Sequence, residues 1–474
     1  MLFCSQEFLV FFLLVFGSYW LVPNDRFRTY LLLGASIFFY SCWNPWLSFL
    51  IVVSTAIDYA IARRMDDSRD ERVRRTLLVT SVCLNLGLLG YFKYANFFLD
   101  SLEQTLRFIG AEVSLPTLRV LLPIGISFYT FEAISYIVDV YHRRIKAERS
   151  LPNFLLFILF FPHLVAGPIV RARDFLPQIS RHKHWSWLRM QHGTELFLLG
   201  LFKKLAIADR MAAVADPIFA NPEAFRTSTV WLGILAYSVQ IYCDFSGYSD
   251  MAIGIAHMFG FKLGVNFRMP YLAQNIAEFW RRWHISLSSW LRDYVFIPLG
   301  GSRGGTMQTS RNLMITMALG GLWHGASWPF VLWGVAHGGL LVIHRAFRRF
   351  CEQTPGFVQI LESRFGTTAR IAVTVLAVSL CWVLFRAPTL GIAQTIYHRL
   401  FIPMPGAGSP LPILSVLILV GVTAVAHLVA DSGRWRVWWS RLPSEVLAVG
   451  YATLALVAAF LAPASGKAFI YFQF

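Results

Sequence analysis

Long apolar runs separated by short polar segments set the pattern of this 474-residue chain. An α-helix needs about 20 apolar residues to cross ~30 Å of hydrocarbon, and most of the runs reach that length. Their hydrophobic positions do not alternate with period two, as they would in the strands of a membrane barrel. We therefore predict an all-α, polytopic integral membrane protein with about 10–12 transmembrane or re-entrant helices. The apolar runs cover residues 6–23, 29–62, 77–99, 118–141, 151–170, 194–215, 229–261, 312–344, 370–386, 411–430 and 445–463.

Charged residues fall mainly between these runs and predict the topology. The segment "ARRMDDSRDERVRR" holds six arginines against four acidic residues, so we expect it on the cytoplasmic side. The first run lacks a basic segment before it and a small-residue cleavage site after it, which favours a retained span with its N-terminus outside. Because we find no internal repeat and no soluble segment, we predict one membrane-embedded domain over residues 1–474, with core motifs at about 120–345.

Composition excludes several classes of protein. Charged residues make up only 14% of the chain, against roughly 25% in a soluble domain. The net charge of +16 comes from loop arginines, and positive-inside topology explains it without a nucleic-acid partner. The six cysteines are scattered and no zinc-type spacing occurs, so we expect no metal site. The lipid bilayer is the partner that this composition implies.

One histidine stands alone in a long apolar run. The segment "NLMITMALGGLWHGASWPFVLWG" has His324 as its single ionisable side chain. Such residues usually face a bundle interior or a water-filled cavity, because exposure to hydrocarbon is costly. We expect open space around the imidazole, since Gly320, Gly321 and Gly325 remove side-chain bulk and Pro329 interrupts the helical ladder. His324 is a candidate general base, and a hydrogen bond to a neighbouring helix is the structural alternative.

A second candidate lies in the segment "EFWRRWHISLSSWLRDYVFIPLGG". Read at helical spacing, Trp280, Trp283, Leu287 and Leu291 share an apolar face, and His284 falls on that face. An inward imidazole on an interfacial helix makes His284 a candidate for the same cavity. The alternative is that tryptophans and arginines anchor this helix at the lipid headgroups.

Other polar residues have weaker signals. Asp244, Asp250 and His257 lie in one apolar run, and a helix break at Gly247 would bring both carboxylates into one polar network, for which a structural role is favoured. The loop "LGGSRGG", with Arg303, offers backbone amides to a phosphate but lacks the context of a nucleotide motif, so a plain turn is favoured.

The segment "KAFIYFQF" carries four aromatic residues and no charged side chain after its lysine. We expect it to be tucked into membrane or protein instead of water. The phenol of Tyr471 is either a nucleophile beside a base or an interfacial aromatic anchor.

Taken together, six segments resemble the membrane-bound O-acyltransferase family, most closely its alginate O-acetyltransferase branch. They follow one another in the order typical of the family and span most of the chain. The segments are "PIGISFYTFEAISYIVDVY", "FPHLVAGPIVR", "QIYCDFSGYSDMAIG", "FWRRWHISLSSWLRDYVFIPLGG", "GGLWHGASWPFVLWGVAHG" and "FIYFQF".

The resemblance implies a ring of helices around a central funnel, with His324 of "LWHG" at the family's invariant histidine position and His284 of "RWHIS" at its second polar position. It implies transfer of an acetyl group from a cytoplasmic donor, acetyl-CoA, across the bacterial inner membrane toward hydroxyls of an extracytoplasmic polysaccharide such as alginate. No permanently bound cofactor is expected. Arg281, Arg282 and Arg303 are candidates for binding the donor's phosphates.

The resemblance also implies a periplasmic partner of the SGNH-hydrolase type. A separate hypothesis is that, if "FIYFQF" reaches the outer side of the funnel, Tyr471 accepts the acetyl group transiently and hands it to a serine of that partner. Peptidoglycan and cellulose are alternative acceptors, because acetyltransferases for these polymers share the motifs. The alternative from another class is a proton-coupled transporter or channel that uses His324, Asp244 and Asp250. A third alternative is a scaffold for polysaccharide export, in which His324 would be dispensable.

Overall fold

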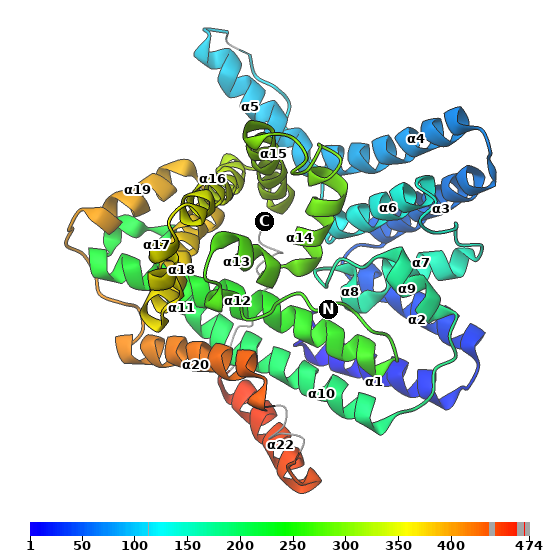
Figure 1. Cartoon of the computed structure of the whole chain (residues 1–474). Coiled ribbons are helices and arrows are strands. Elements are labelled where there is room, and N and C mark those ends of the chain that lie inside the picture. Colours follow the sequence, from blue (N-terminus) through cyan, green and yellow to red (C-terminus); the bar gives the residue numbers. More distant parts are fainter. Residues whose placement is uncertain (112, 436–440, 462–468, 470–474) are drawn as a thin grey trace. The chain divides into compact units, whose positions relative to one another are not determined.

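The computed structural model describes residues 1–111, 113–435, 441–461 and 469, and every regular element in these residues is a helix (Figure 1). The prediction of an all-α fold is confirmed. Contacts divide the chain into two compact units: unit 1 comprises residues 1–197 and 251–264, and unit 2 comprises residues 198–250 and 265–474. The single domain expected over the whole chain stays a prediction.

Unit 1 is built from helices whose starts are encoded locally. Asn24 and Asn44 each precede a helix, and their side-chain oxygens accept the backbone N–H groups of Phe27 and Leu47, as N-caps do. The helices of unit 1 are α1 (Gln6–Leu21), α2 (Asp25–Ser41), α3 (Pro45–Asp67), α4 (Glu71–Leu89), the π-helix η1 (Gly90–Tyr94), α5 (Ala95–Phe108), α6 (Ile126–Tyr141), α7 (Leu151–Leu159), α8 (Phe161–Leu164), α9 (Ala172–Ile179) and most of α10 (Trp187–Phe202).

Unit 2 holds the remaining helices and contains both candidate histidines. Its named elements are η2 (Lys203–Ala208), α11 (Asp209–Ala220), η3 (Pro222–Ala224), most of α12 (Thr227–Met258), η4 (Pro270–Leu272), α13 (Ile276–Arg282), α14 (Ile285–Leu291), η5 (Arg292–Phe296), α15 (Thr306–His324), α16 (Trp328–Glu352), α17 (Pro355–Glu362), α18 (Arg364–Arg386), α19 (Leu390–Phe401), α20 (Ile413–Ser432) and α22 (Ser444–Leu461). The elements η2 and η5 are π-helices and η3 and η4 are 3₁₀-helices.

Six described helical segments are long and apolar enough to cross a membrane: α3, the continuous α4–η1–α5 segment, α16, α18, α20 and α22. The chain is therefore a multi-pass membrane protein. Several of the other predicted runs form shorter or interrupted helices. The run at 312–344 contains two helices, α15 and α16, and the run at 151–170 contains α7 and α8.

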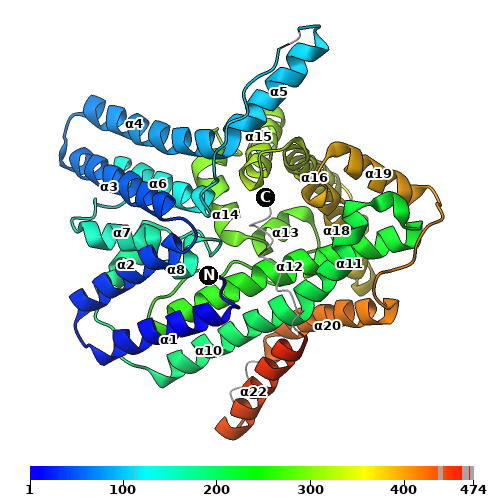
Figure 2. The same cartoon turned by 180° about the vertical axis from the view of Figure 1, so that it is seen from behind.

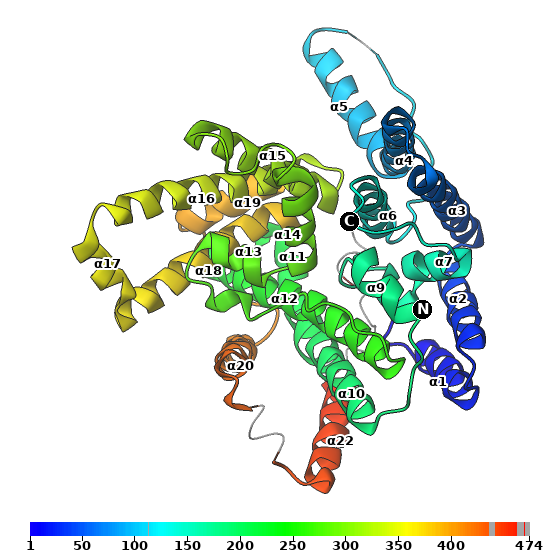
Figure 3. The same cartoon turned by 45° about the vertical axis from the view of Figure 1, so that its right-hand side comes forward.

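The helices α15 and α16 form a tight antiparallel pair in unit 2 (Figure 2). A Cβ atom at Gly334 would lie 2.2 Å from the carbonyl oxygen of Met317, and one at Gly321 would lie 2.2 Å from that of Phe330. Only glycine permits so close an approach of two backbones. After the turn of α17, α18 returns along α16 (Figure 3). This arrangement places the C-terminal end of α15, and thus His324, among helices α16 and α18.

Candidate active site

His324 is the last residue of α15, and 4% of it is exposed. The backbone becomes extended at Gly325, and Ser327 is the N-cap residue of the next helix, α16. Pro329 lies in the first turn of α16, where a proline removes no helical hydrogen bond. The interruption of the predicted run therefore lies between two helices, directly after the histidine.

The expectation of open space beside His324 is wrong. A Cβ atom at Gly325 would lie 2.1 Å from the ring of Phe330, so that side chain fills the room that the glycine leaves. The rings of Trp333 and Phe385 each lie 5.1 Å, centroid to centroid, from the imidazole of His324. The glycines serve the close packing of helices and rings, and the histidine is enclosed by aromatic side chains.

His284 lies at a break where the sequence predicted one continuous interfacial helix. Helix α13 ends at Arg282, and α14 begins at Ile285, so the single amphipathic helix is wrong. His284 has a left-handed backbone with φ 42° and ψ 54°, which residues with a Cβ atom adopt rarely. The inward orientation expected of the imidazole is correct, because His284 has no exposed surface.

The fold brings the two histidines together in unit 2. The ring centroids of His284 and His324 are 6.2 Å apart, and Trp323 packs beside both, at 5.8 Å and 4.9 Å respectively. The ring of Phe245, on α12, packs edge-to-face with the imidazole of His284, with their centroids 4.6 Å apart. Two imidazoles 40 residues apart in the sequence thus share one buried aromatic environment.

Burial keeps His284 in its neutral form. It lies in the sequence between the candidate membrane spans, and desolvation lowers its pKa from 6.5 to about 3. A neutral imidazole can accept a proton on one nitrogen while it donates from the other. The residue can therefore act as a hydrogen-bonding partner at physiological pH.

The carboxylates of α12 have structural partners, without the helix break expected at Gly247. Lys204 of η2 lies 2.8 Å from Asp244 and 2.9 Å from Asp209, and its neighbour Lys203 lies 2.6 Å from Asp250. Helix α12 is continuous through Gly247, where a Cβ atom would lie 2.7 Å from the carbonyl oxygen of Gly200. Neither lysine was among the residues predicted from the sequence, although buried carboxylates need such cations nearby.

The three candidate arginines have different surroundings. Arg281 and Arg303 are exposed, whereas Arg282 forms ion pairs of 2.9 Å with Glu278 and 2.8 Å with Asp431. Two carboxylates compete with any phosphate for the Arg282 guanidinium. The assignment of Arg281, Arg282 and Arg303 to donor binding stays a prediction.

Tyr471 lies outside the described residues. Phe469, two residues before it, is described and buried, and its ring stacks on Tyr248 at 4.6 Å and contacts Phe245 at 5.9 Å. Phe245 in turn contacts His284. Phe469 therefore lies against the helix that packs on the candidate site, and the placement of Tyr471 stays a prediction.

Unit 1 also contains an enclosed histidine, His163, which lies in the motif "FPHLVAGPIVR" and was not predicted to be a site residue. The Nε2 atom of His163, on α8, lies 3.3 Å from Oε2 of Glu132, on α6. The other carboxylate oxygen accepts the backbone N–H of Val170 at 2.8 Å. At most 1% of His163 and Glu132 is exposed. This pair joins α6 to the chain that follows α8.

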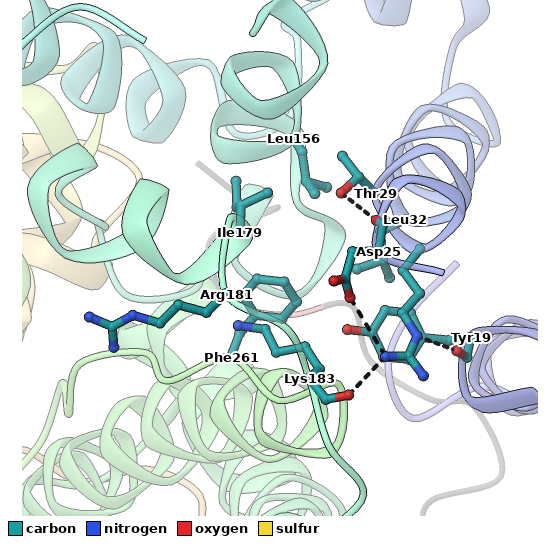
Figure 4. A pocket seen from close by; sticks show the side chains of 10 residues that line it. Tyr19, Asp25, Thr29, Leu32, Leu156, Ile179, Arg181, Lys183 and Phe261 are labelled. Carbon is teal, nitrogen blue, oxygen red and sulfur yellow. Dashed lines mark hydrogen bonds and ion pairs between the residues drawn. The ribbon is translucent and has the colours of Figure 1, made fainter. Parts of the chain in front are cut away.

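Figure 4 shows a small pocket in unit 1, and hydrogen bonds of Arg28 cross-link its lining. Arg28 donates from Nε to the carbonyl oxygen of Tyr19 at 2.9 Å and from Nη1 to that of Lys183 at 2.9 Å. These bonds tie α1, α2 and the segment before α10 together. Among the described residues, no group of three histidine, cysteine, aspartate or glutamate side chains is placed to hold a metal ion.

The described residues thus form an all-helical membrane fold in which two histidines of unit 2 are enclosed together. A sequence model of the membrane-bound O-acyltransferase family matches residues 141–363. The chain is 46% identical over 404 residues to the probable alginate O-acetylase AlgI of Azotobacter vinelandii, covering 85% of this chain and 78% of that protein. It is 36% identical over 397 residues to the peptidoglycan O-acetyltransferase of Helicobacter pylori, covering 77% and 72%.

The chain therefore belongs to the membrane-bound O-acyltransferase family, and it is an O-acyltransferase. It is also 31% identical over 241 residues to the teichoic acid D-alanyltransferase of Streptococcus thermophilus, covering 48% of this chain and 57% of that protein. The resemblance drawn from the motifs is confirmed.

Proposed function

We propose that this enzyme moves an acetyl group from a cytoplasmic thioester, acetyl-CoA, toward hydroxyl groups of an extracytoplasmic polysaccharide, with alginate as the acceptor. The proposal is supported by the relative named as a probable alginate O-acetylase, which is 46% identical to this chain. A Pseudomonas aeruginosa protein of the same name is 45% identical, over 85% of this chain and 75% of its own length. The enzyme would reside in the bacterial inner membrane, between donor and acceptor.

The observation that carries the mechanism is the enclosed pair of His284 and His324, 6.2 Å apart. His324 removes the proton of the acceptor hydroxyl as its oxygen attacks the carbonyl carbon of the thioester. A carbon–oxygen bond forms, the carbon–sulfur bond breaks, and the leaving thiolate receives a proton. His284 positions or polarises the reacting groups by hydrogen bonding in a site from which bulk water is excluded.

Donor binding is assigned to exposed cations of unit 2. Among the described residues, two carboxylates hold Arg282 and none forms an ion pair with Arg281 or Arg303, so these two exposed arginines are better suited to contact the phosphates of acetyl-CoA. Arg282 instead supports the C-terminal end of α13, directly before the turn at His284. Acetyl-CoA is a substrate in this proposal, and no resident cofactor is required.

The acceptor side is assigned to the terminal segment and to a partner protein. Tyr471 would accept the acetyl group on its phenol oxygen, releasing the thiol, and hand it to the serine of a periplasmic SGNH-hydrolase-like acetyltransferase. The proposal is supported by Phe469, two residues before Tyr471, which is buried against Tyr248 and Phe245. Acetyl on Tyr471 in trapped protein is the expected mass-spectrometric result, and full activity of Tyr471→Phe would eliminate the relay.

Peptidoglycan is the second candidate acceptor, because a peptidoglycan O-acetyltransferase is 36% identical over most of both chains. The chemistry at the histidines would be the same. Acetylation of purified alginate and of purified peptidoglycan, side by side with the same enzyme, separates the two acceptors. Cellulose serves as the third polymer in that comparison.

The proposed function is tested with purified protein in detergent and radiolabelled acetyl-CoA. We expect thioester consumption by the wild type, its loss in His324→Ala, and its retention in His337→Gln, a matched control because His337 is equally enclosed. Candidate partner proteins and glycans are added if the basal rate is low. A folded wild type that leaves the thioester untouched under all these conditions would overturn acetyl-CoA as the donor.

A further inference from the structure

The helix that follows His284 begins without a cap of its own. His284 occupies the N-cap position of α14, where serine, threonine, asparagine and aspartate normally bind the exposed N–H groups of the first turn. Its carbonyl oxygen accepts the N–H of Ser288 at 2.9 Å, as an N-cap residue's does. Its side chain makes no capping hydrogen bond and lies toward Phe245 and His324 instead.

Asn266, from the segment before α13, provides the missing cap. Its side-chain oxygen Oδ1 accepts the backbone N–H of Ser286 at 3.2 Å and the hydroxyl of the same residue at 3.0 Å. Its backbone oxygen accepts the N–H of Ile285 at 3.0 Å. Two consecutive N–H groups at the start of α14 thus bind one distant residue, of which only 1% is exposed.

The same segment also holds the other side of the turn. Arg268 donates its backbone N–H to the carbonyl oxygen of Arg282 at 2.9 Å, just before the turn, while Asn266 binds just after it. Asn266 is itself fixed to α12, because its Nδ2 donates to Ser249 Oγ at 3.4 Å. Residues 266–268 therefore clamp both flanks of the left-handed backbone at His284.

We propose that Asn266 is a positioning residue for catalysis: it caps α14 in place of His284 and so leaves that imidazole directed toward His324. This proposal rests on the function proposed above. Without the cap, the first turn of α14 loses its hydrogen-bond acceptors, and the side chain of His284 can rotate to satisfy them. The imidazole would then no longer face the second histidine.

The test compares Asn266→Ala with Asn275→Ala, a matched control. Asn275 is also an asparagine that caps a helix and is partly buried, because its Oδ1 accepts the N–H of Glu278 at 2.8 Å. It caps α13, which does not follow a histidine. We expect Asn266→Ala to lower kcat about 10–100-fold, as a small misplacement of a reacting group does, with KM for acetyl-CoA nearly unchanged. Asn275→Ala should change kcat much less.

Asn266→Asp is the conservative rescue, because it keeps Oδ1 as the acceptor for Ser286 while Ser249 can donate to the second oxygen. It should recover most of kcat. Equal losses in the alanine and aspartate variants, or a kcat loss in Asn275→Ala as large as that in Asn266→Ala, would overturn the proposal. Wild-type and His324→Ala enzymes in the same assay show separately whether the proposed function holds.

A second measurement does not depend on turnover. In histidine-labelled protein, the NMR signal of His284, identified by its loss in His284→Asn, should stay untitrated between about pH 5 and 8 in the wild type. In Asn266→Ala its chemical shift should change, because the imidazole leaves the rings of Phe245 and His324 and binds the first turn of α14 instead. An unchanged chemical shift of His284 in Asn266→Ala would overturn the positioning role, even if the enzyme took its acyl group from a donor other than acetyl-CoA.

Discussion

The enclosed histidine of unit 1 and the enclosed histidines of unit 2 have opposite surroundings. His163 of unit 1 lies 3.3 Å from the carboxylate of Glu132, which a backbone N–H holds in place. His284 and His324 of unit 2 lie among the rings of Trp323, Phe245 and their neighbours. All of these histidines are nearly or completely buried.

The difference separates a joining role from a chemical one. A carboxylate beside an imidazole fixes its orientation and ties two segments together, so the pair in unit 1 supports the fold. Aromatic walls exclude water from an imidazole that exchanges a proton with a substrate. Burial alone does not identify a catalytic histidine, and neither does an aromatic wall, because His337 is also buried among the rings of Trp280 and Trp333. What distinguishes His284 and His324 is that their two imidazoles lie 6.2 Å apart, centroid to centroid.

The largest effect is expected at His324. His324→Ala should lower kcat about 10²–10⁴-fold, the usual contribution of a general base, while the melting temperature in detergent stays close to that of the wild type. Turnover and thermal unfolding are measured on the same preparation. Substantial activity in a correctly folded His324→Ala enzyme would remove this residue from the mechanism.

His163→Leu should show the reverse pattern. It leaves the buried carboxylate of Glu132 without the imidazole, which costs about 3–5 kcal/mol of stability when a buried pair loses one partner. Turnover per folded molecule should remain near that of the wild type. The double variant Glu132→Gln/His163→Leu keeps the acceptor for Val170 and should regain part of the lost stability. If His163→Leu abolished turnover without lowering the melting temperature, the comparison between the units would fail.

The stability of unit 2 should depend on pH through His284. Its pKa is about 3 in the folded protein and 6.5 ordinarily, so below pH 6.5 the unfolded chain binds a proton that the folded chain does not. Stability from this residue is therefore complete above pH 6.5 and falls toward pH 3, by about 1 kcal/mol between pH 6.5 and 5.5. Melting temperatures across this range should fall less steeply in His284→Asn. Parallel curves for the two proteins would contradict the prediction.

The smallest effect is expected at an exposed ion pair of unit 1. Arg149 lies 3.1 Å from Asp66 and 2.8 Å from Asp67, but about half of its side chain is exposed at 52%. Water and salt screen such pairs, so Arg149→Ala should leave both turnover and melting temperature nearly unchanged. A large loss of stability in Arg149→Ala would show that exposed charges contribute more to the stability of unit 1 than the enclosed pair of His163 and Glu132 does.

Much of the fold could be predicted because it follows from local patterns. Apolar runs specify helices in a bilayer, and asparagines at 24 and 44 specify where α2 and α3 begin. The break at His284 could not be predicted, because the periodicity of residues 279–291 is compatible with one helix. The clamp that enforces the break comes from residues 266–268.

The candidate site was predicted in its residues but not in its surroundings. A lone histidine in an apolar run is costly, and this cost identified His324 before any contact was known. The enclosure of that histidine by Trp333 and Phe385, instead of open space, depends on the packing of α15, α16 and α18. The packing of helices that are separated in the sequence leaves no signal within a single apolar run.

By itself the sequence determined a helical membrane protein, the family to which it belongs and the two histidines that carry the proposed chemistry. Only the tertiary structure decided that His284 and His324 face each other, that Asn266 caps the turn between α13 and α14, and that Lys204 joins Asp209 to Asp244. The physical reason is range. Hydrophobic periodicity and capping act over a few neighbouring residues, whereas these contacts join side chains that the folded backbone alone brings within hydrogen-bonding or van der Waals distance.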